Sequence, residues 1–394
     1  ELIGTGKKQI NFSQVPIEKA TSYSCEDADF TFRLKKHLEP KIIDMKLQPL
    51  LNDIEMPLIS VLGDMEEAGV RIDTNFLGEL SKEYGAKLAE LEKKIYDECG
   101  EEFNLNSPQQ LGRILFDKLK LKSTRRTAKG GSRATSVDIL TKLAEEHHVP
   151  RMMLEYRQLT KLKSTYIDAL PLMVNHRTSL VHTSFNQTIA ATGRLSSTDP
   201  NLQNIPIKTD EGREIRKAFI PRADDSKILS ADYSQIELRI MAHFANDPMM
   251  IASFQKGEDI HRRTAAEVYG VDINDVTPAQ RRKAKTANFA IIYGVSAYGL
   301  AQQSELSFTE SKDFIQVYFE RYPGIKSYMD RSIEFARNNG FVSTMFNRRR
   351  YLPDISAKSV QARQFAERIA INMPIQGTAA DMIKIAMIHI AQRM

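Results

Sequence analysis

An aspartate follows a short apolar run at residues 227–231. We expect this run to form a buried strand, which would place Asp232 at the rim of a sheet, where backbone carbonyl groups can also bind a hard cation. Ser234 and Glu237 match the S-x-x-E pattern of a capping box and predict a helix directly after the strand. A carboxylate in this position suits magnesium-assisted phosphoryl transfer. The alternative is an exposed aspartate in an ordinary strand-to-helix turn, and this segment alone does not decide between the two.

A second candidate site lies on a helix that we expect to begin after Thr277. Pro278 suits the first helical position, and Gln280 suits the third. Cations near the start of a helix would meet phosphates, helped by the partial positive charge of the helix N-terminus, and Phe289 would stack on a base and sugar. Solvated cations and packed aromatic rings are the competing interpretation. The side chains that recur every four residues and form one slowly winding stripe are Arg281, Lys285, Phe289 and Tyr293.

A third pattern lies near the end of the chain, where Arg368, Asn372 and Gln376 also recur every four residues. Their helix is expected to bend at Pro374. A guanidinium group and two amides in a row can read the minor-groove acceptors that every base pair presents. An ordinary polar helix face is the competing interpretation.

Residues 118–133 contain seven basic side chains, no acidic ones and the pair Gly130-Gly131. Regular structure is not expected there. We favour a basic arm that lies on a phosphate backbone and binds less well as salt rises, over a loop that is only solvated. The basic residues are Lys118, Lys120, Lys122, Arg125, Arg126, Lys129 and Arg133.

Composition limits the protein class more than it limits function. A chain of 394 residues is too long for one ordinary core, so about two to four domains are expected. With 42% hydrophobic and 27% charged residues, the chain is globular and not disordered. No run approaches the roughly 18 to 20 apolar residues of a membrane helix. Cys25 and Cys99 have no metal-type spacing and indicate a reducing compartment.

Helical patterns dominate the rest of the chain. We expect a strand at residues 8–12, a helix at 24–38, helices from 48 to 80 broken at 69–73, a charged helix to 99, a helix begun by Ser107 and Pro108, helices up to residue 170, a strand at 181–186, and a hairpin at 340–352 that carries Arg348-Arg349-Arg350.

Four segments together closely resemble the polymerase region of bacterial family A DNA polymerases. They are residues 192–206, 232–239 (the family's motif A), 281–294 (motif B) and 372–377. Residues 161–166 are similar to the family's junction between thumb and palm. Because these long segments occur in the family's order and spacing, the resemblance extends over nearly the whole chain.

The resemblance implies an α+β, helix-rich fold: a right-hand polymerase of thumb, palm and fingers that carries the tail of an exonuclease domain. The implied parts are the C-terminal remnant of a 3′–5′ exonuclease domain at 1–45, the thumb at 46–175, the first part of the palm at 176–245, the fingers at 246–350, and an incomplete return to the palm at 351–394.

The resemblance also implies roles for single residues. Asp232 would be catalytic and, with the Tyr233 carbonyl, would bind metal in a site for two Mg²⁺ ions. Lys285 would also be catalytic. The residues implied to bind the nucleotide are Gln235, Glu237, His261, Arg281, Lys285, Phe289 and Tyr293. Those implied to bind DNA are Tyr166, Arg194, Asn201, Gln203, Asn204, Arg368, Asn372 and Gln376.

Glu237 has two expected roles. The capping box is a sufficient structural reason for a glutamate, and in the family the same residue excludes the ribose 2′-hydroxyl by a steric clash. Phe289 matches members that disfavour dideoxynucleotides.

The sequence departs from the family in several places. The family's His-Asp-Glu motif, which supplies the second metal-binding carboxylate, does not occur and is expected soon after residue 394. We therefore expect a piece of a longer protein that is inactive or nearly so. Tyr23 and Asp27 resemble the last motif of the proofreading exonuclease, whose other acids would lie upstream. Ala290 and Asn347 stand where relatives often have glycine.

The implied activity is template-directed DNA synthesis in repair and replication, with primer-template DNA and deoxynucleoside triphosphates as partners. A monomer in the bacterial cytoplasm, at the nucleoid and without membrane attachment, is expected. A single-subunit RNA polymerase is the first alternative, and Glu237 and Phe289 argue against it. The second is a module that binds DNA without catalysis, which a single-turnover incorporation assay would identify. A nuclease is excluded because the upstream acids are missing.

Overall fold

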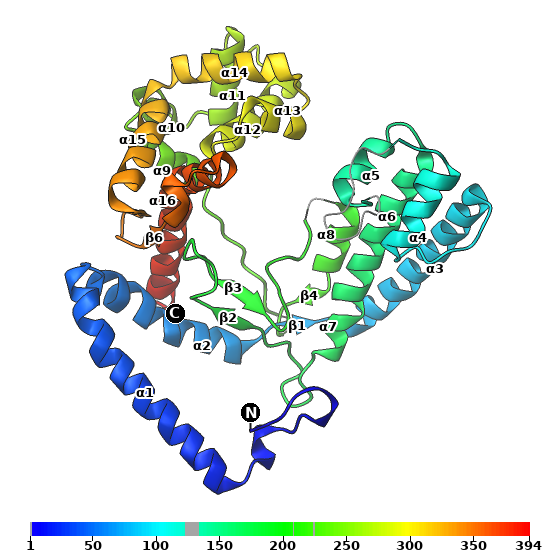
Figure 1. Cartoon of the computed structure of the whole chain (residues 1–394), viewed down its shortest axis with the longest axis vertical. Helices are drawn as coiled ribbons and strands as arrows, with labels where there is room; N and C mark the ends of the chain where they lie inside the picture. Colours follow the sequence, from blue (N-terminus) through cyan, green and yellow to red (C-terminus); the bar gives the residue numbers. More distant parts are fainter. Residues whose placement is uncertain (1, 123–133, 208, 224) are drawn as a thin grey trace. The chain divides into compact units, whose positions relative to one another are not determined.

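The computed structural model describes residues 2–122, 134–207, 209–223 and 225–394 (Figure 1). The chain divides into two compact units. The first comprises Glu1–Val61, Gln187–Leu195 and Tyr233–Met394, and the second comprises Leu62–Asn186 and Ser196–Asp232. Both are built mainly from helices, as the sequence predicts, and each is described by itself.

The core of the second unit lies between helices α3 (Thr74–Cys99) and α6 (His148–Leu162). Leu77, Ile95 and Met153 are fully buried in it, because apolar residues recur on one face of each helix. The Asp73 carboxylate accepts a hydrogen bond from the Phe76 backbone and so caps α3.

The remaining elements of the second unit are short. Ser107 caps its helix as predicted, by accepting a hydrogen bond from the Gln110 backbone. The elements are β1 (Arg71–Ile72), α4 (Pro108–Gly112), a π-helix (Arg113–Lys118), α5 (Val137–Leu143), a second π-helix (Lys163–Ile167), α7 (Ala169–Leu172), β2 (Ser184–Asn186), β3 (Ser196–Thr198), α8 (Asp210–Arg216) and β4 (Phe219–Ile220).

Two small antiparallel sheets lie in this unit. Arg71 pairs with Ile220 between β1 and β4, and Ser184 pairs with Thr198 between β2 and β3. The strand expected at residues 181–186 is confirmed over its last three residues, whereas Val181 forms only isolated bridges.

The first unit has a helical core of its own, centred on α9 (Ile236–Ala245), α11 (Ile260–Tyr269) and α12 (Pro278–Ile292). Its other elements are two 3₁₀ turns (Gly6–Lys8 and Phe12–Gln14), α1 (Ile17–Asp44), a π-helix (Leu50–Glu55), α10 (Pro248–Gln255), α13 (Ala297–Gln303), α14 (Phe308–Arg321), α15 (Pro323–Asn339), β5 (Phe341–Ser343), β6 (Arg349–Tyr351), a 3₁₀ turn (Pro353–Ser356) and α16 (Val360–Ala391). The helix α2 (Met56–Ala68) follows the π-helix at Leu50–Glu55.

The hairpin predicted at residues 340–352 is confirmed. Ser343 pairs with Arg349 between β5 and β6, and the Thr344 backbone donates to the Arg348 carbonyl at 3.0 Å. Asn347 adopts a left-handed backbone (φ 62), which asparagine tolerates better than most residues.

Two predicted strands are wrong. Residues 227–231 form no strand, and Ile228 and Leu229 are 58% and 92% exposed. A strand needs a neighbouring strand to which its backbone can hydrogen-bond. No described segment pairs with this run, and an apolar pattern alone does not provide a partner. Residues 8–12 instead lie between two 3₁₀ turns, and the Asn11 side chain caps the second turn.

The predicted capping box at Ser234 and Glu237 is also wrong. Helix α9 begins at Ile236, and its N-cap is Gln235, which has a left-handed backbone (φ 55) and makes no capping hydrogen bond through its side chain. The Glu237 carboxylate is instead bonded to Arg194 and Tyr293.

Helix α1 contains the helix expected at residues 24–38 but is longer, and none of its residues is buried. In the part of the chain that the structure describes, no helix is long and apolar enough to cross a membrane.

Candidate nucleotide and DNA site

Helix α12 presents the predicted stripe because its opposite face is buried. Ala284, Ala287 and Ile291 pack into the core of the first unit. The helix begins with the predicted capping box, in which the Gln280 backbone donates to the Thr277 hydroxyl at 3.2 Å and the Thr277 backbone donates to the Gln280 side chain at 2.9 Å. Capping and burial together fix the helix and leave the cations accessible.

The two cations of the stripe have different surroundings. Arg281 donates to the Asp259 carboxylate at 2.7 Å, and Asp259 also caps α11 by accepting from the backbone of His261 at 3.0 Å. Burial opposes ionisation of Asp259, but the Arg281 guanidinium and the backbone donors outweigh it, so its pKa is lowered. Lys285 is exposed, and within the described ranges it forms no ion pair. Lys285 is thus available to an anionic ligand.

His261 is only 3% exposed and lies against Phe289, with ring centroids 5.7 Å apart. The Asn288 side-chain amide is hydrogen-bonded to its Nδ1 at 3.1 Å, and an imidazole that accepts this bond carries its proton on Nε2. Burial lowers the pKa of His261 to about 4, and the nearby Arg281 and Lys285 act in the same direction. His261 is therefore neutral near pH 7 and can serve as a hydrogen-bond donor through Nε2.

Glu237 joins the turn before β3 to the end of α12. Its carboxylate accepts a hydrogen bond from Arg194 at 2.5 Å and another from the Tyr293 hydroxyl. The Glu237 side chain is 12% exposed, whereas that of Arg194 is 54% exposed. Burial and the Glu237 charge raise the pKa of Tyr293 to about 12, so its hydroxyl keeps its proton as the donor.

Helix α16 brings two of its three predicted polar residues to Tyr293. The Asn372 amide donates to the Tyr293 carbonyl at 3.3 Å, and the Gln376 side chain lies near enough to Tyr293 to lower the pKa of its hydroxyl. Arg368 is exposed on the same helix, with its guanidinium 5.8 Å from the Phe365 ring centroid. The structure therefore brings the predicted stripes of α12 and α16 together at Tyr293.

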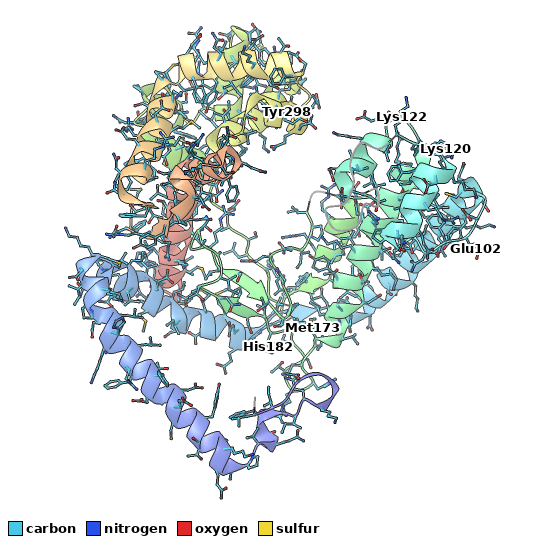
Figure 2. The ribbon with its side chains drawn as sticks, viewed as in Figure 1. Glu102, Lys120, Lys122, Met173, His182 and Tyr298 are labelled. Carbon is cyan, nitrogen blue, oxygen red and sulfur yellow. The ribbon has the colours of Figure 1, made fainter. Side chains whose placement is uncertain are left out.

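In the second unit, Tyr166 and Asn204 line a cleft of about 890 Å³, together with Asn201. The Tyr166 hydroxyl donates to the Asn204 carbonyl at 2.5 Å, and the Asn201 side chain accepts from the Gln203 backbone at 3.1 Å. These four predicted DNA-binding residues thus lie together. Lys161, Thr165 and Met173 also line the cleft. Met173 is labelled in Figure 2.

Part of the predicted basic arm can be placed. Lys118 lies in the π-helix Arg113–Lys118, and Lys120 and Lys122 are exposed after it (Figure 2). The rest of the arm, residues 123–133, lies outside the described residues.

The two residues of the exonuclease motif lie on α1. Tyr23 is 47% exposed, and the nearby Asp27 carboxylate raises the pKa of Tyr23.

Asp232 and Tyr233 are both exposed. Among the residues that the structure describes, no group of three or more His, Cys, Asp and Glu side chains is arranged to hold a metal ion. Among the described residues, Asp232 and the Tyr233 carbonyl would therefore supply only part of a site for two Mg²⁺ ions, and we assign no chemical step to a metal.

Two residues of this site were not predicted from sequence. Asp259 anchors Arg281, and its place directly before a helical pattern was a detectable capping signal. Asn288 fixes the orientation of His261, but a buried amide inside a helix has no comparable signal in a single sequence.

Comparisons with known proteins show which family the chain belongs to. Residues 74–394 match the family model of DNA polymerase family A. The DNA polymerase I of Pseudomonas aeruginosa is 50% identical over 392 residues, which is 99% of this chain and 43% of that protein. That of Geobacillus stearothermophilus is 50% identical over 345 residues, which is 88% of this chain and 39% of that protein.

The chain spans less than half the length of these relatives. A solved structure, the POL domain of Pol1 from M. smegmatis in complex with DNA primer-template and dNTP, matches with a TM-score of 0.87 and 42% identity. The match covers 92% of this chain and 64% of that one. The chain has the right-hand polymerase fold and belongs to DNA polymerase family A.

Proposed function

We propose that this chain holds primer-template DNA and a deoxynucleoside triphosphate in template-directed DNA synthesis, which adds nucleotides to the primer 3′-hydroxyl in repair and replication. The observation that supports this most is the α12 face, where exposed Lys285 lies one turn from Arg281 and one turn from Phe289. The relatives named DNA polymerase I and the M. smegmatis complex support the same activity.

We assign the nucleotide to the α12 face. Lys285 and Arg281 would bind the triphosphate, since both are cations near the helix N-terminus. Phe289 would pack on the sugar and base, and neutral His261 would donate a hydrogen bond to a phosphate oxygen. Gln235, the N-cap of α9, would also contact the nucleotide.

Glu237 and Tyr293 would contribute to the choice of nucleotide, Glu237 through the sugar and Tyr293 through the position of the template base. Glu237 is fixed by its two donors, so it is a rigid obstacle to a ribose 2′-hydroxyl. Tyr293 would occupy the position of the template base until that base enters.

The minor groove of the DNA would be contacted by amide and guanidinium groups, which can hydrogen-bond to its acceptors. The proposed residues are Tyr166, Arg194, Asn201, Gln203, Asn204, Arg368, Asn372 and Gln376. Lys118, Lys120 and Lys122 would add salt-sensitive contacts to phosphates.

DNA polymerases of this family use divalent metal ions. We propose Mg²⁺ as the ion and Asp232, with the Tyr233 carbonyl, as ligands and Asp232 as the catalytic carboxylate. Lys285 would be the second catalytic residue.

We further propose that residues 1–45 derive from an exonuclease domain, which Tyr23 and Asp27 would mark. Residues 46–175 would form the thumb, 176–245 and 351–394 the palm, and 246–350 the fingers. A monomer associated with the bacterial nucleoid is the proposed working state.

A module that binds DNA without catalysis is the second candidate function. The observation that favours it is that the described residues gather no carboxylate cluster for metal ions. Single-nucleotide extension of a labelled primer-template, with Mg²⁺ and with Mn²⁺, distinguishes the two. Extension that Asp232→Ala abolishes assigns catalysis to Asp232. No extension, with salt-sensitive DNA binding intact, assigns binding alone to this chain.

A further inference from the structure

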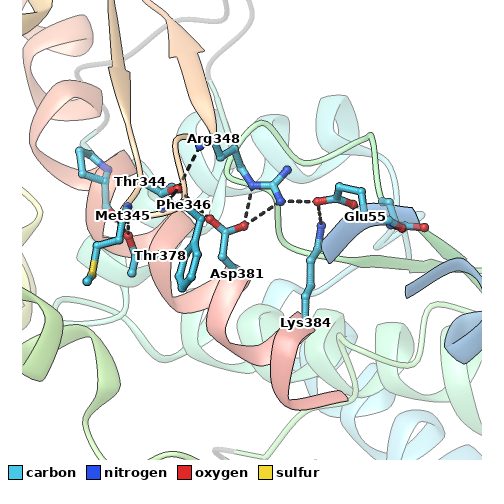
Figure 3. Close-up of polar contacts among 10 residues, drawn as sticks. Glu55, Thr344, Met345, Phe346, Arg348, Thr378, Asp381 and Lys384 are labelled. Carbon is cyan, nitrogen blue, oxygen red and sulfur yellow. Dashed lines mark hydrogen bonds and ion pairs between the residues drawn. The ribbon is translucent and has the colours of Figure 1, made fainter. Parts of the chain in front are cut away.

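A network of four charged side chains connects Glu55, Arg348, Asp381 and Lys384 (Figure 3). Arg348 lies at its centre, with its Nε 2.8 Å from the Asp381 carboxylate and its guanidinium also bonded to Glu55. Lys384 donates to the same Glu55 oxygen at 2.8 Å. Asp381 and Lys384 belong to α16, so the network attaches the hairpin turn and the π-helix at Leu50–Glu55 to that helix.

This network is almost completely removed from solvent. The side chains of Asp381 and Lys384 are 0% and 1% exposed, and those of Arg348 and Glu55 are 14% and 18% exposed. The Thr344 hydroxyl donates to Asp381 at 2.7 Å, which uses the second carboxylate oxygen. A guanidinium held between two buried carboxylates has little freedom to move.

Arg348 also packs directly against Gly193. A Cβ atom placed on Gly193 would lie 2.6 Å from the Arg348 Cδ, and the backbone of Gly193 is left-handed (φ 81). Both observations require glycine at this position. On the other side, a Cβ on Gly377 of α16 would lie 3.2 Å from the Thr192 carbonyl oxygen. The turn at Thr192 and Gly193 is thus enclosed by Arg348 and α16.

The next residue along the chain is Arg194, whose guanidinium bonds to Glu237 at 2.5 Å. Arg194 is 54% exposed, so little packing around its own side chain restricts it. Its direction depends on the backbone of the turn before it, where the Gly193 amide donates to the Ala190 carbonyl at 2.8 Å. A substitution of Arg348 that shifts this backbone would therefore also alter the bond between Arg194 and Glu237.

We propose that Arg348 is a positioning residue, which holds the Gly193 turn so that Arg194 meets Glu237 and keeps that carboxylate in place for discrimination between deoxyribose and ribose. The part that concerns the sugar rests on the proposed function. The part that concerns the turn does not.

The first experiment measures amide hydrogen exchange of the whole chain without DNA. Arg348→Lys keeps the charge but cannot bond to Asp381 and Glu55 through one planar group. We expect exchange at Gly193 to speed up by about fivefold or more, with less change in the core of α12. Lys384→Met is the matched control, because Lys384 bonds to the same Glu55 oxygen but makes no contact with Gly193. Exchange at Gly193 should then stay within about twofold of the parent chain.

The second experiment measures the ratio of deoxynucleotide to ribonucleotide affinity in the complex with primer-template DNA. Arg348→Lys should lower this ratio by about three- to tenfold, as should Arg194→Ala. If Arg348 acts through Arg194, the double variant should match Arg194→Ala, because neighbours that act along one path are not additive. Lys384→Met should leave the ratio unchanged.

Equal acceleration of exchange at Gly193 in Arg348→Lys and Lys384→Met would overturn the proposal, as would fully additive effects on the sugar ratio. If the parent chain binds no nucleotide, the proposed function fails, and the exchange experiment still decides whether Arg348 holds the turn.

Discussion

The Glu237 carboxylate accepts one hydrogen bond from Arg194 and one from Tyr293, so three segments far apart in sequence meet at one acid. Both donors lie in segments that resemble family A motifs. The contact gives Glu237 a fixed position even though it caps no helix. An acid held in this way is suited to excluding a substituent from a narrow space.

Removing the Glu237 side chain should weaken sugar discrimination. Glu237→Ala should lower the ratio of deoxynucleotide to ribonucleotide affinity by about tenfold or more, because the obstacle beneath C2′ is gone. The ratio is measured by titrating each nucleotide into a complex with a labelled primer-template. An unchanged ratio, with the variant folded and bound to DNA, would contradict the proposed role.

Lys285 should contribute more to nucleotide binding than Arg282 of the same helix. Lys285→Ala should weaken deoxynucleotide affinity by about tenfold or more, because an unpaired cation meets the triphosphate. Arg282→Ala is the control, since Arg282 lies on the same helix and is paired with Glu305 at 3.2 Å. Isothermal titration of both variants in the DNA complex makes the comparison, and equal losses would refute the assignment.

His261 should make stability depend on pH. The unfolded chain takes up a proton near pH 6.5, the ordinary pKa of histidine, and the folded protein does so only near pH 4. The unfolded state therefore binds more protons between these values, so the contribution of His261 is present above pH 6.5 and lost as pH falls toward 4. Its size is on the order of 3 kcal/mol.

Urea unfolding at pH 7 and at pH 4.5 tests this statement. His261→Gln should reduce the loss of unfolding free energy between the two pH values, because glutamine takes up no proton and can still accept from Asn288. A loss as large as in the parent chain would show that other groups carry the pH dependence.

Removing the hydroxyl groups of Thr277 and Ser234 should have different effects on the free energy of unfolding. Thr277→Ala should lower the free energy of unfolding by about 1 kcal/mol, because its hydroxyl caps α12. Ser234→Ala should change it by less than about 0.5 kcal/mol, because Ser234 is exposed and caps no helix. Denaturant unfolding of the pair tests the contrast, and a similar cost for both would restore the capping box at Ser234.

Local signals in the sequence predicted the elements that they control. The capping box at Thr277, the N-cap at Ser107 and the hairpin that carries Arg348 are all confirmed, because each depends on residues close together in the chain. Periodicity likewise predicted that Phe289 and the α12 cations share a face that is not buried.

Features that depend on distant partners were not predictable. Residues 227–231 have the apolar pattern of a strand but no paired neighbour among the described residues, and Glu237 is bonded to partners 43 and 56 residues away. The partners of Arg348 are at separations of 293 and 33 residues. No pattern in a single sequence specifies such contacts.

The most direct test of the central claim uses a primer-template whose primer ends in a dideoxynucleotide, so that binding is measured without incorporation. With Mg²⁺ present, the deoxynucleotide that pairs with the template base should stabilise the complex about tenfold more than the other three. Lys285→Ala should weaken binding of this nucleotide about tenfold, because its triphosphate loses a cation. Equal stabilisation by all four nucleotides, with DNA binding intact, would contradict a template-directed polymerase site in this chain.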